Sequence, residues 1–209
     1  MDILTDVALL SRIQFALTVA YHFIFVPLSI GLGLITAIFA TKYYRSRDEK
    51  DGAAVRLWVK IFTATFAIGV ATGITMEFSF GTNWADYSRF VGDIFGAPLA
   101  AEALFAFFLE SVFLGVLLFG RNKVSPKFYT VSAWLVWAGS LLSALWILIA
   151  NSWMQTPAGA ELAADGKKAI ITDFLAAAMN PSIAPRYFHV IVALLITGAS
   201  APLVLGGWY

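Results

Sequence analysis

Residues 96–120 read GAPLAAEALFAFFLESVFLGVLLFG, an apolar stretch long enough to cross a bilayer that nevertheless carries two carboxylates, Glu102 and Glu110. An acidic residue near the middle of a membrane helix costs roughly 3 kcal/mol, so it normally faces a protein interior, a wet cavity or a partner. On a regular helix the two residues are separated by about 12 Å along the axis and about 80° around it. One buried face can therefore hold both carboxylates at different depths, as a path or a site requires.

Glu102 also has a purely structural interpretation. Pro98 is expected to open this helix, and a carboxylate in the first turn would reach the interface and stabilise the helix start. Glu110 lies near mid-membrane with no basic residue close to it in the same helix, so that interpretation is weaker for Glu110.

The composition places the whole chain in a membrane. Apolar residues make up 60% of it and charged residues only 13%, with a mean hydropathy of +0.79. The net charge of +1 provides no basic surface for nucleic acid. Cysteine is absent, so any metal or haem must be held by His, Met or a carboxylate.

We expect an all-α fold, a bundle of five transmembrane helices that forms a single membrane domain over residues 1–209. The second span contains Gly69 and Gly73, a small-xxx-small pattern that predicts close helix packing. Residues 78–94 are expected to form an ordered interfacial loop, and residues 155–184 a surface segment with a short helix. The spans are expected at about 8–41, 57–78, 98–120, 128–153 and 185–209.

Basic residues predict the orientation. The connectors after the first and third spans hold nine of the 14 Lys and Arg residues, so they are expected inside and the N-terminus outside. Glu77, Glu102 and His189 then lie in the outer half of the membrane. The first connector spreads its basic residues over residues 42–60, and the third span is followed by Arg121, Lys123 and Lys127.

Both histidines of the chain, His22 and His189, fall within apolar spans. A single histidine in a membrane helix is more often a buried hydrogen-bonding group than a ligand, but two of them, with none left for the loops, favour function. A zinc site needs several clustered ligands, which the sequence lacks. Single, widely spaced histidines suit haem, which takes one axial nitrogen from a helix.

Four segments resemble subunit I of the cytochrome bd quinol oxidases, and the resemblance extends over the whole chain. They read QFALTVAYHFIFVPLSIGL (14–32), FAIGVATGITMEFSFGTNW (66–84), YSRFVGDIFGAPLAAEALFAFFLES (87–111) and SALWILIANSWMQTP (143–157). The resemblance implies a terminal respiratory oxidase with a low-spin haem b, a high-spin haem b and a haem d. Such an enzyme oxidises quinol and reduces dioxygen to water, and it builds a proton gradient without pumping.

The resemblance also assigns roles to individual residues. His22 resembles the axial ligand of a high-spin haem, and His189 one axial ligand of the low-spin haem b. Glu102 is similar to the carboxylate at the high-spin pair, as haem ligand or proton donor. The polar positions that line the family's proton route from the inside are matched by Glu110, Ser111 and Ser143.

Partners and location follow from the same resemblance. It implies a multi-pass protein of the bacterial cytoplasmic (inner) membrane, a second large membrane subunit and small single-span subunits. Family members continue through further spans that supply a haem-ligating methionine and a quinol-binding loop. None of Met1, Met76, Met154 and Met179 lies where that ligand is expected. We therefore expect the N-terminal part of a longer subunit, one half of a split subunit, or a shortened relative.

Two alternatives from other functional classes stay open at this stage. The first is a structural or assembly subunit that keeps the fold without redox function. The second is a proton or ion transporter that uses Glu102 and Glu110 without haem.

Overall fold

The computed structural model describes residues 6–208, so Met1 and the expected span end at residue 209 lie outside the described part. Within that part, five helical segments are long and apolar enough to cross a membrane, which confirms the expected fold class. The first two spans are α1, Val7–Ser46, and α2, Glu49–Gly81. The third span is continuous and consists of α3, Ala85–Ala101, η2, Glu102–Phe107, and α4, Phe108–Phe119. The fourth span is α5, Pro126–Gln155, and α7, Ile183–Trp208, follows the short helix α6, Phe174–Ala178.

The connection between α1 and α2 is much shorter than the basic segment 42–60 predicted. Arg47 ends α1 in the left-handed conformation, with φ 56°, and Asp48 caps α2 by accepting from the Lys50 backbone N–H at 2.9 Å. The basic residues of this segment therefore lie on the helix ends rather than in a loop. Their long side chains can reach the interface from helical positions.

The expected interfacial loop at 78–94 is wrong, because this segment is almost entirely helical. Only a short turn at 82–84 separates α2 from α3, and α3 already begins at Ala85. Pro98 is buried inside α3 and does not open a helix. Glu102 is therefore far from any helix start, and its structural interpretation as an end cap does not hold.

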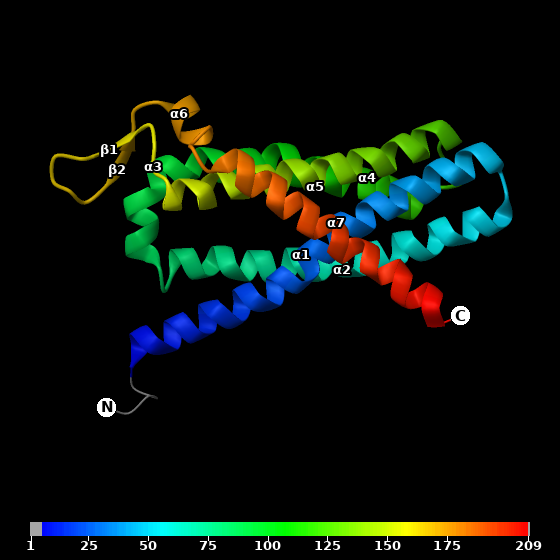
Figure 1. Ribbon diagram of the computed structural model, residues 1–209, viewed down its shortest axis with the longest axis horizontal. Helices are drawn as coiled ribbons and strands as arrows, with labels where there is room; N and C mark the ends of the chain where they lie inside the picture. The colour runs from blue at the N-terminus through cyan, green and yellow to red at the C-terminus, as the bar shows by residue number, and fades with distance from the viewer. Residues whose placement is uncertain (1–5, 209) are drawn as a thin grey trace.

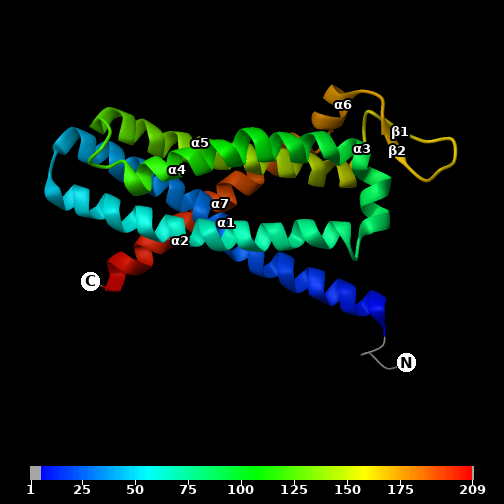
Figure 2. The same ribbon diagram turned by 180° about the vertical axis from the view of Figure 1, so that it is seen from behind.

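The helices run back and forth along one long axis (Figures 1 and 2). The α1–α2 and α4–α5 turns, which carry the basic residues, lie together at one end, here called the basic end. The start of α1, the α2–α3 turn and the strands lie at the opposite end, with the first half of α1 diverging from the other helices. The two connectors rich in Lys and Arg therefore lie on the same side of the bundle, as the charge pattern predicts. Which side faces the inside of the cell stays a prediction.

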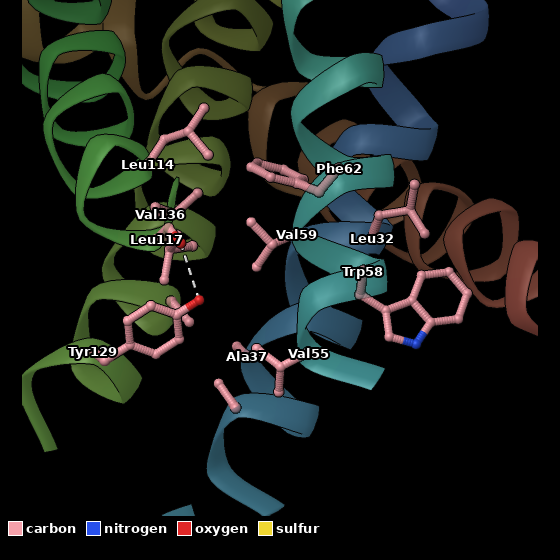
Figure 3. Packing of buried hydrophobic residues seen from close by; sticks show 12 residues of the cluster. Leu32, Ala37, Val55, Trp58, Val59, Phe62, Leu114, Leu117, Tyr129 and Val136 are labelled. Carbon is pink, nitrogen blue, oxygen red and sulfur yellow. Dashed lines mark hydrogen bonds between the residues drawn. The ribbon is translucent and has the colours of Figure 1, made fainter. Parts of the chain in front are cut away.

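The main core packs at the basic end, between α1, α2, α4 and α5 (Figure 3). Phe62 is fully buried there, and the Tyr129 hydroxyl donates to the Leu117 carbonyl at 3.0 Å. The buried residues of α1 begin only at Pro27 and continue toward the basic end. The first half of α1 is therefore much less buried than the second.

The segment between α5 and α7 contains a hairpin that the sequence did not predict. Strand β1, Ala160–Leu162, pairs antiparallel with β2, Ala169–Ile171, with Ala160 opposite Ile171. The Asp93 carboxylate accepts from the Ile171 backbone N–H at 2.9 Å and anchors the hairpin on α3. The predicted short helix is present as α6, and α7 begins at Ile183, two residues before the expected start.

The backbones of α1 and α7 approach each other closely at Gly31 and Gly198. A Cβ added to either glycine would overlap the backbone of the other. The predicted pair Gly69 and Gly73 is only partly engaged, because a Cβ on Gly69 would meet nothing within 4 Å. Helix α7 is thus held on α1 by a crossing that only glycine permits.

We predict that Gly31→Ala lowers the free energy of unfolding by about 1 to 3 kcal/mol, because a side chain that meets backbone cannot be accommodated by a rotamer change. The matched control is Gly69→Ala, which also lies in a membrane helix but has free space. Thermal unfolding followed by tryptophan fluorescence measures both variants. Equal losses in the two variants would contradict the assignment of this crossing.

Candidate functional site

Two carboxylates of the third span face serine hydroxyls of α5. The Ser143 hydroxyl donates to Glu102 Oε1 at 2.7 Å, and the Ser140 hydroxyl lies 2.5 Å from Glu110 Oε1. Glu110 is 5% exposed and Ser140 4%, whereas Glu102 and Ser143 are half-buried. The predicted use of one buried face for both carboxylates agrees with this geometry, and each carboxylate has its own hydroxyl partner.

A π-helical segment, η2, lies between the two carboxylates and changes their relative direction. A π turn takes up one extra residue, so the eight-residue spacing acts like seven residues of α-helix, about 20° short of two full turns. The 80° separation expected for a regular helix is therefore wrong. The π turn explains why Glu102 and Glu110 both meet α5.

The contact between Glu110 and α5 depends on a glycine. A Cβ on Gly139 would lie 2.6 Å from Glu110 Cγ and 3.3 Å from the Ala106 carbonyl oxygen. Because Gly139 has no side chain, the carboxyl group can reach the neighbouring Ser140. Sequence reasoning missed Ser140 as a site residue, although the pair Gly139-Ser140 within an apolar span was a signal that could have found it.

Ser111 takes no clear part in this arrangement. Its side chain is half-buried, and none of the hydrogen bonds described among residues 6–208 involves its hydroxyl. Ser143, the other serine predicted for the proton route, contacts Glu102 rather than Glu110. Glu110 and Ser143 of the predicted route therefore belong to two separate carboxyl–hydroxyl pairs.

His22 is held by α2. Its Nδ1 lies 2.9 Å from the Thr72 hydroxyl, and a Cβ on Gly73 would lie 3.2 Å from its Cε1. The single proton of Thr72 is already within reach of the Ile68 and Gly69 carbonyls, at 2.8 and 3.0 Å. A Thr72 hydroxyl that donates to one of these carbonyls can accept from His22 Nδ1–H, and in that tautomer the ring's other nitrogen, Nε2, keeps its lone pair.

His189 has a different environment. Its ring is exposed on α7, and no hydrogen bond to it is found in the described part of the chain. Two residues earlier, the Tyr187 hydroxyl donates to the Leu141 carbonyl on α5 at 3.0 Å. A two-residue step turns about 200° around a helix, so His189 faces away from α5.

The methionines also have defined places within residues 6–208. Met76 is half-buried on α2, and Met179 follows α6 with 68% of its surface exposed. Met154 follows the expected end of the fourth span at residue 153, but it belongs to the last turn of α5, where Tyr87 donates to its sulfur. No group of three His, Cys, Asp or Glu residues that could hold a metal ion is found in the described residues.

Comparison with known proteins identifies the family. The family described as cytochrome bd terminal oxidase subunit I matches residues 10–209. The chain belongs to this family. Its membership confirms the resemblance inferred from the four sequence segments and implies haem cofactors.

Individual relatives agree with the family assignment. The chain is 49% identical over 204 residues to cytochrome bd-II ubiquinol oxidase subunit 1 of Escherichia coli. This alignment covers 98% of the chain and 40% of the Escherichia coli protein. The chain is 47% identical over 190 residues to cytochrome bd ubiquinol oxidase subunit 1 of Bacillus subtilis. That alignment covers 91% of the chain and 40% of the Bacillus subtilis protein. The chain thus spans about two fifths of the length of these curated relatives.

A solved structure shares the fold. The bd oxidase of Geobacillus thermodenitrificans matches with a TM-score of 0.84 at 31% identity, over 96% of this chain and 45% of that chain. The bundle described above is therefore the bundle of a bd oxidase subunit rather than a generic membrane fold.

The donor set fits a haem at His22. An axial ligand must present an unprotonated ring nitrogen, and a hydrogen-bond acceptor at the other nitrogen fixes that tautomer. Thr72 supplies this acceptor and Gly73 supplies room beside the ring. For His189 the chemistry of the side chain fits, but none of the described residues orients the ring.

We predict that Thr72→Val destabilises the protein by about 1 to 3 kcal/mol, since it removes the hydroxyl that lies 2.9 Å from Nδ1 of the half-buried His22. The control is Thr75→Val, because Thr75 also donates to a carbonyl one turn back, that of Ala71, but has no bond to His22. Thermal unfolding of the two variants is then repeated in a His22→Phe background. The cost of Thr72→Val should fall to that of the control there, and a cost that persists would contradict the assigned bond.

Proposed function

We propose that this chain forms the haem-holding and proton-delivering part of a terminal oxidase that passes electrons from quinol to dioxygen. The observation that carries the proposal is the pair of membrane-buried carboxylates, Glu102 and Glu110, each paired with a hydroxyl of α5, in a chain of this family. Reduction of dioxygen to water consumes one proton for each electron. A buried site for that reaction therefore needs protonatable groups within the membrane.

His22 and His189 are the proposed axial ligands. His22 would present Nε2 to the iron of a high-spin haem, with Thr72 holding the ring. His189 would be one ligand of a low-spin haem b, which receives electrons from quinol. When bound, the haems supply reversible one-electron transfer and the reduction of dioxygen. We further propose that they comprise two haems b and one haem d, as the resemblance implies.

Glu110 and Glu102 are the proposed proton-carrying groups. Glu110 would take up protons arriving from the inside, and Glu102 would donate them at the high-spin pair or act as a ligand there. Ser143 would hold Glu102, to which it already donates. Ser111 remains a proposed member of this route on the basis of the resemblance alone. Proton uptake from the inside, with quinol oxidised near the outer face, would build the gradient without pumping.

The partner subunits and the membrane in which the chain would act belong to the same proposal. The chain would act within a longer subunit, or together with one, beside a second large membrane subunit and small single-span subunits in a bacterial inner membrane. The transporter alternative uses the same carboxylates without haem, and the structural alternative uses neither. Family membership favours the oxidase over both.

The first test separates the two haem ligands. We predict that His22→Ala and His189→Ala remove different bands from the reduced-minus-oxidised optical spectrum, because the histidines lie on separate helices and each offers one nitrogen to one iron. The assembled oxidase is purified with each variant and its haem bands are compared with the wild type. Loss of the same band in both variants would refute separate sites, and an unchanged spectrum in both would refute haem ligation.

The second test separates the two carboxylates. We predict that Glu110→Gln slows quinol-dependent oxygen uptake at least tenfold while keeping the haem spectrum, as removal of a proton-carrying group should. Glu102→Gln is expected to change the high-spin haem bands as well. Oxygen uptake and optical spectra of the same preparations measure both effects. If Glu110→Gln lost haem while Glu102→Gln did not, the two roles would be reversed.

A further inference from the structure

The contact of Glu110 with α5 has a feature that a simple hydrogen bond lacks. Ser140 Oγ lies 2.5 Å from Glu110 Oε1 and, on its other side, 3.2 Å from the Val136 carbonyl oxygen. The serine hydroxyl therefore stands between a carboxyl group and a backbone acceptor. It has one proton to donate and lone pairs to accept with.

This arrangement is satisfied in both protonation states of Glu110. When the carboxyl group is ionised, Ser140 donates its proton to Oε1. When the carboxyl group is protonated on Oε1, it donates to Ser140 Oγ, which turns its own proton to the Val136 carbonyl. Only hydrogen positions change between the two states, so no heavy atom has to move.

We propose that Ser140 is the positioning residue that lets Glu110 gain and lose a proton in place. The inference rests on the proposed function, because it concerns the same proton-carrying carboxylate. Burial makes this partner important, because Glu110 is only 5% exposed and Ser140 only 4%. Without Ser140, the Glu110 carboxyl group would lose this hydrogen bond in its ionised state, its protonated state or both.

The other carboxyl oxygen of Glu110, Oε2, is free to exchange the proton. Ser140 holds Oε1, whereas no hydrogen bond to Oε2 is found among residues 6–208. The other carboxylate that faces α5, Glu102, has a separate partner in Ser143 and does not compete for Ser140. Ser140 thus fixes one oxygen of Glu110 and leaves the second without a hydrogen bond among the described residues.

The test reads the Glu110 carboxyl group directly by infrared spectroscopy of the assembled oxidase. The carbonyl stretching band that appears on lowering the pH and is missing in Glu110→Gln belongs to protonated Glu110. In Ser140→Ala this band should move to higher wavenumber, because the carboxylic acid has lost its acceptor. In Ser140→Thr, which keeps the hydroxyl, the band should stay near its original position.

A matched control lies on the same helix. Ser132 is fully buried and donates to the Phe128 carbonyl at 2.8 Å, but it has no carboxyl partner. Ser132→Ala should leave the band in place and oxygen uptake unchanged, whereas Ser140→Ala should slow uptake about tenfold, as expected from loss of a hydrogen bond to a charged group. The haem spectrum of each preparation verifies assembly.

The outcomes distinguish this inference from the proposed function. If Glu110→Gln slows oxygen uptake but Ser140→Ala changes neither the band nor the rate, the role of Ser140 is wrong and the proton route stands. If Ser140→Ala moves the band but Glu110→Gln leaves oxygen uptake unchanged, the contact stands and the proton route is wrong. An equal band shift in Ser132→Ala would overturn the specific role of Ser140.

Discussion

The structure depends on one constraint, the cost of keeping a carboxyl group inside a membrane helix without water. Glu110 meets it by packing against α5 at Gly139, where the helices approach closely enough for Ser140 to reach the carboxyl group. This contact fixes both the depth and the rotation of α4 on α5. A second carboxylate eight residues earlier would then face about 80° away on a regular helix. The π turn of η2 removes that difference, so Glu102 meets Ser143 on the same partner helix.

The two halves of the bundle serve different purposes. The half near the basic end holds the main apolar core and accounts for most of the close packing between α1, α2, α4 and α5. On α1 the buried residues begin at Pro27, and the crossing with α7 at Gly31 lies just beyond it. His22 lies just before that boundary, in the less buried half. The main core thus fixes the helices near the basic end, and we propose that the less buried first half of α1, which carries His22, lies beside a haem.

The sequence predicted the class of fold, because hydrophobic length is a strong local signal, and intramembrane charge singled out the histidines and carboxylates whose roles stay predictions. Helix ends were less predictable: the aromatic and polar residues of 78–94 suit an interface, but they continue the helix because α3 packs on the hairpin through Asp93. The π turn and the pairing of Glu110 with Ser140 depend on how α4 and α5 sit against each other, which local sequence does not encode. The same holds for glycine packing, where Gly31 and Gly198 make the crossing that Gly69 and Gly73 were expected to make.

Burial differs between the two carboxyl–hydroxyl pairs, and this difference gives the arrangement a direction. Glu110 and Ser140 are enclosed by protein, whereas Glu102 and Ser143 are half-buried in the less densely packed half of the bundle. The enclosed pair is insulated from changes elsewhere, since its partner is supplied entirely by α5. The half-buried pair is accessible to whatever group lies beside it. In the proposed route Glu102 is therefore the carboxylate that can contact a bound group directly, whereas Glu110 stays enclosed by protein.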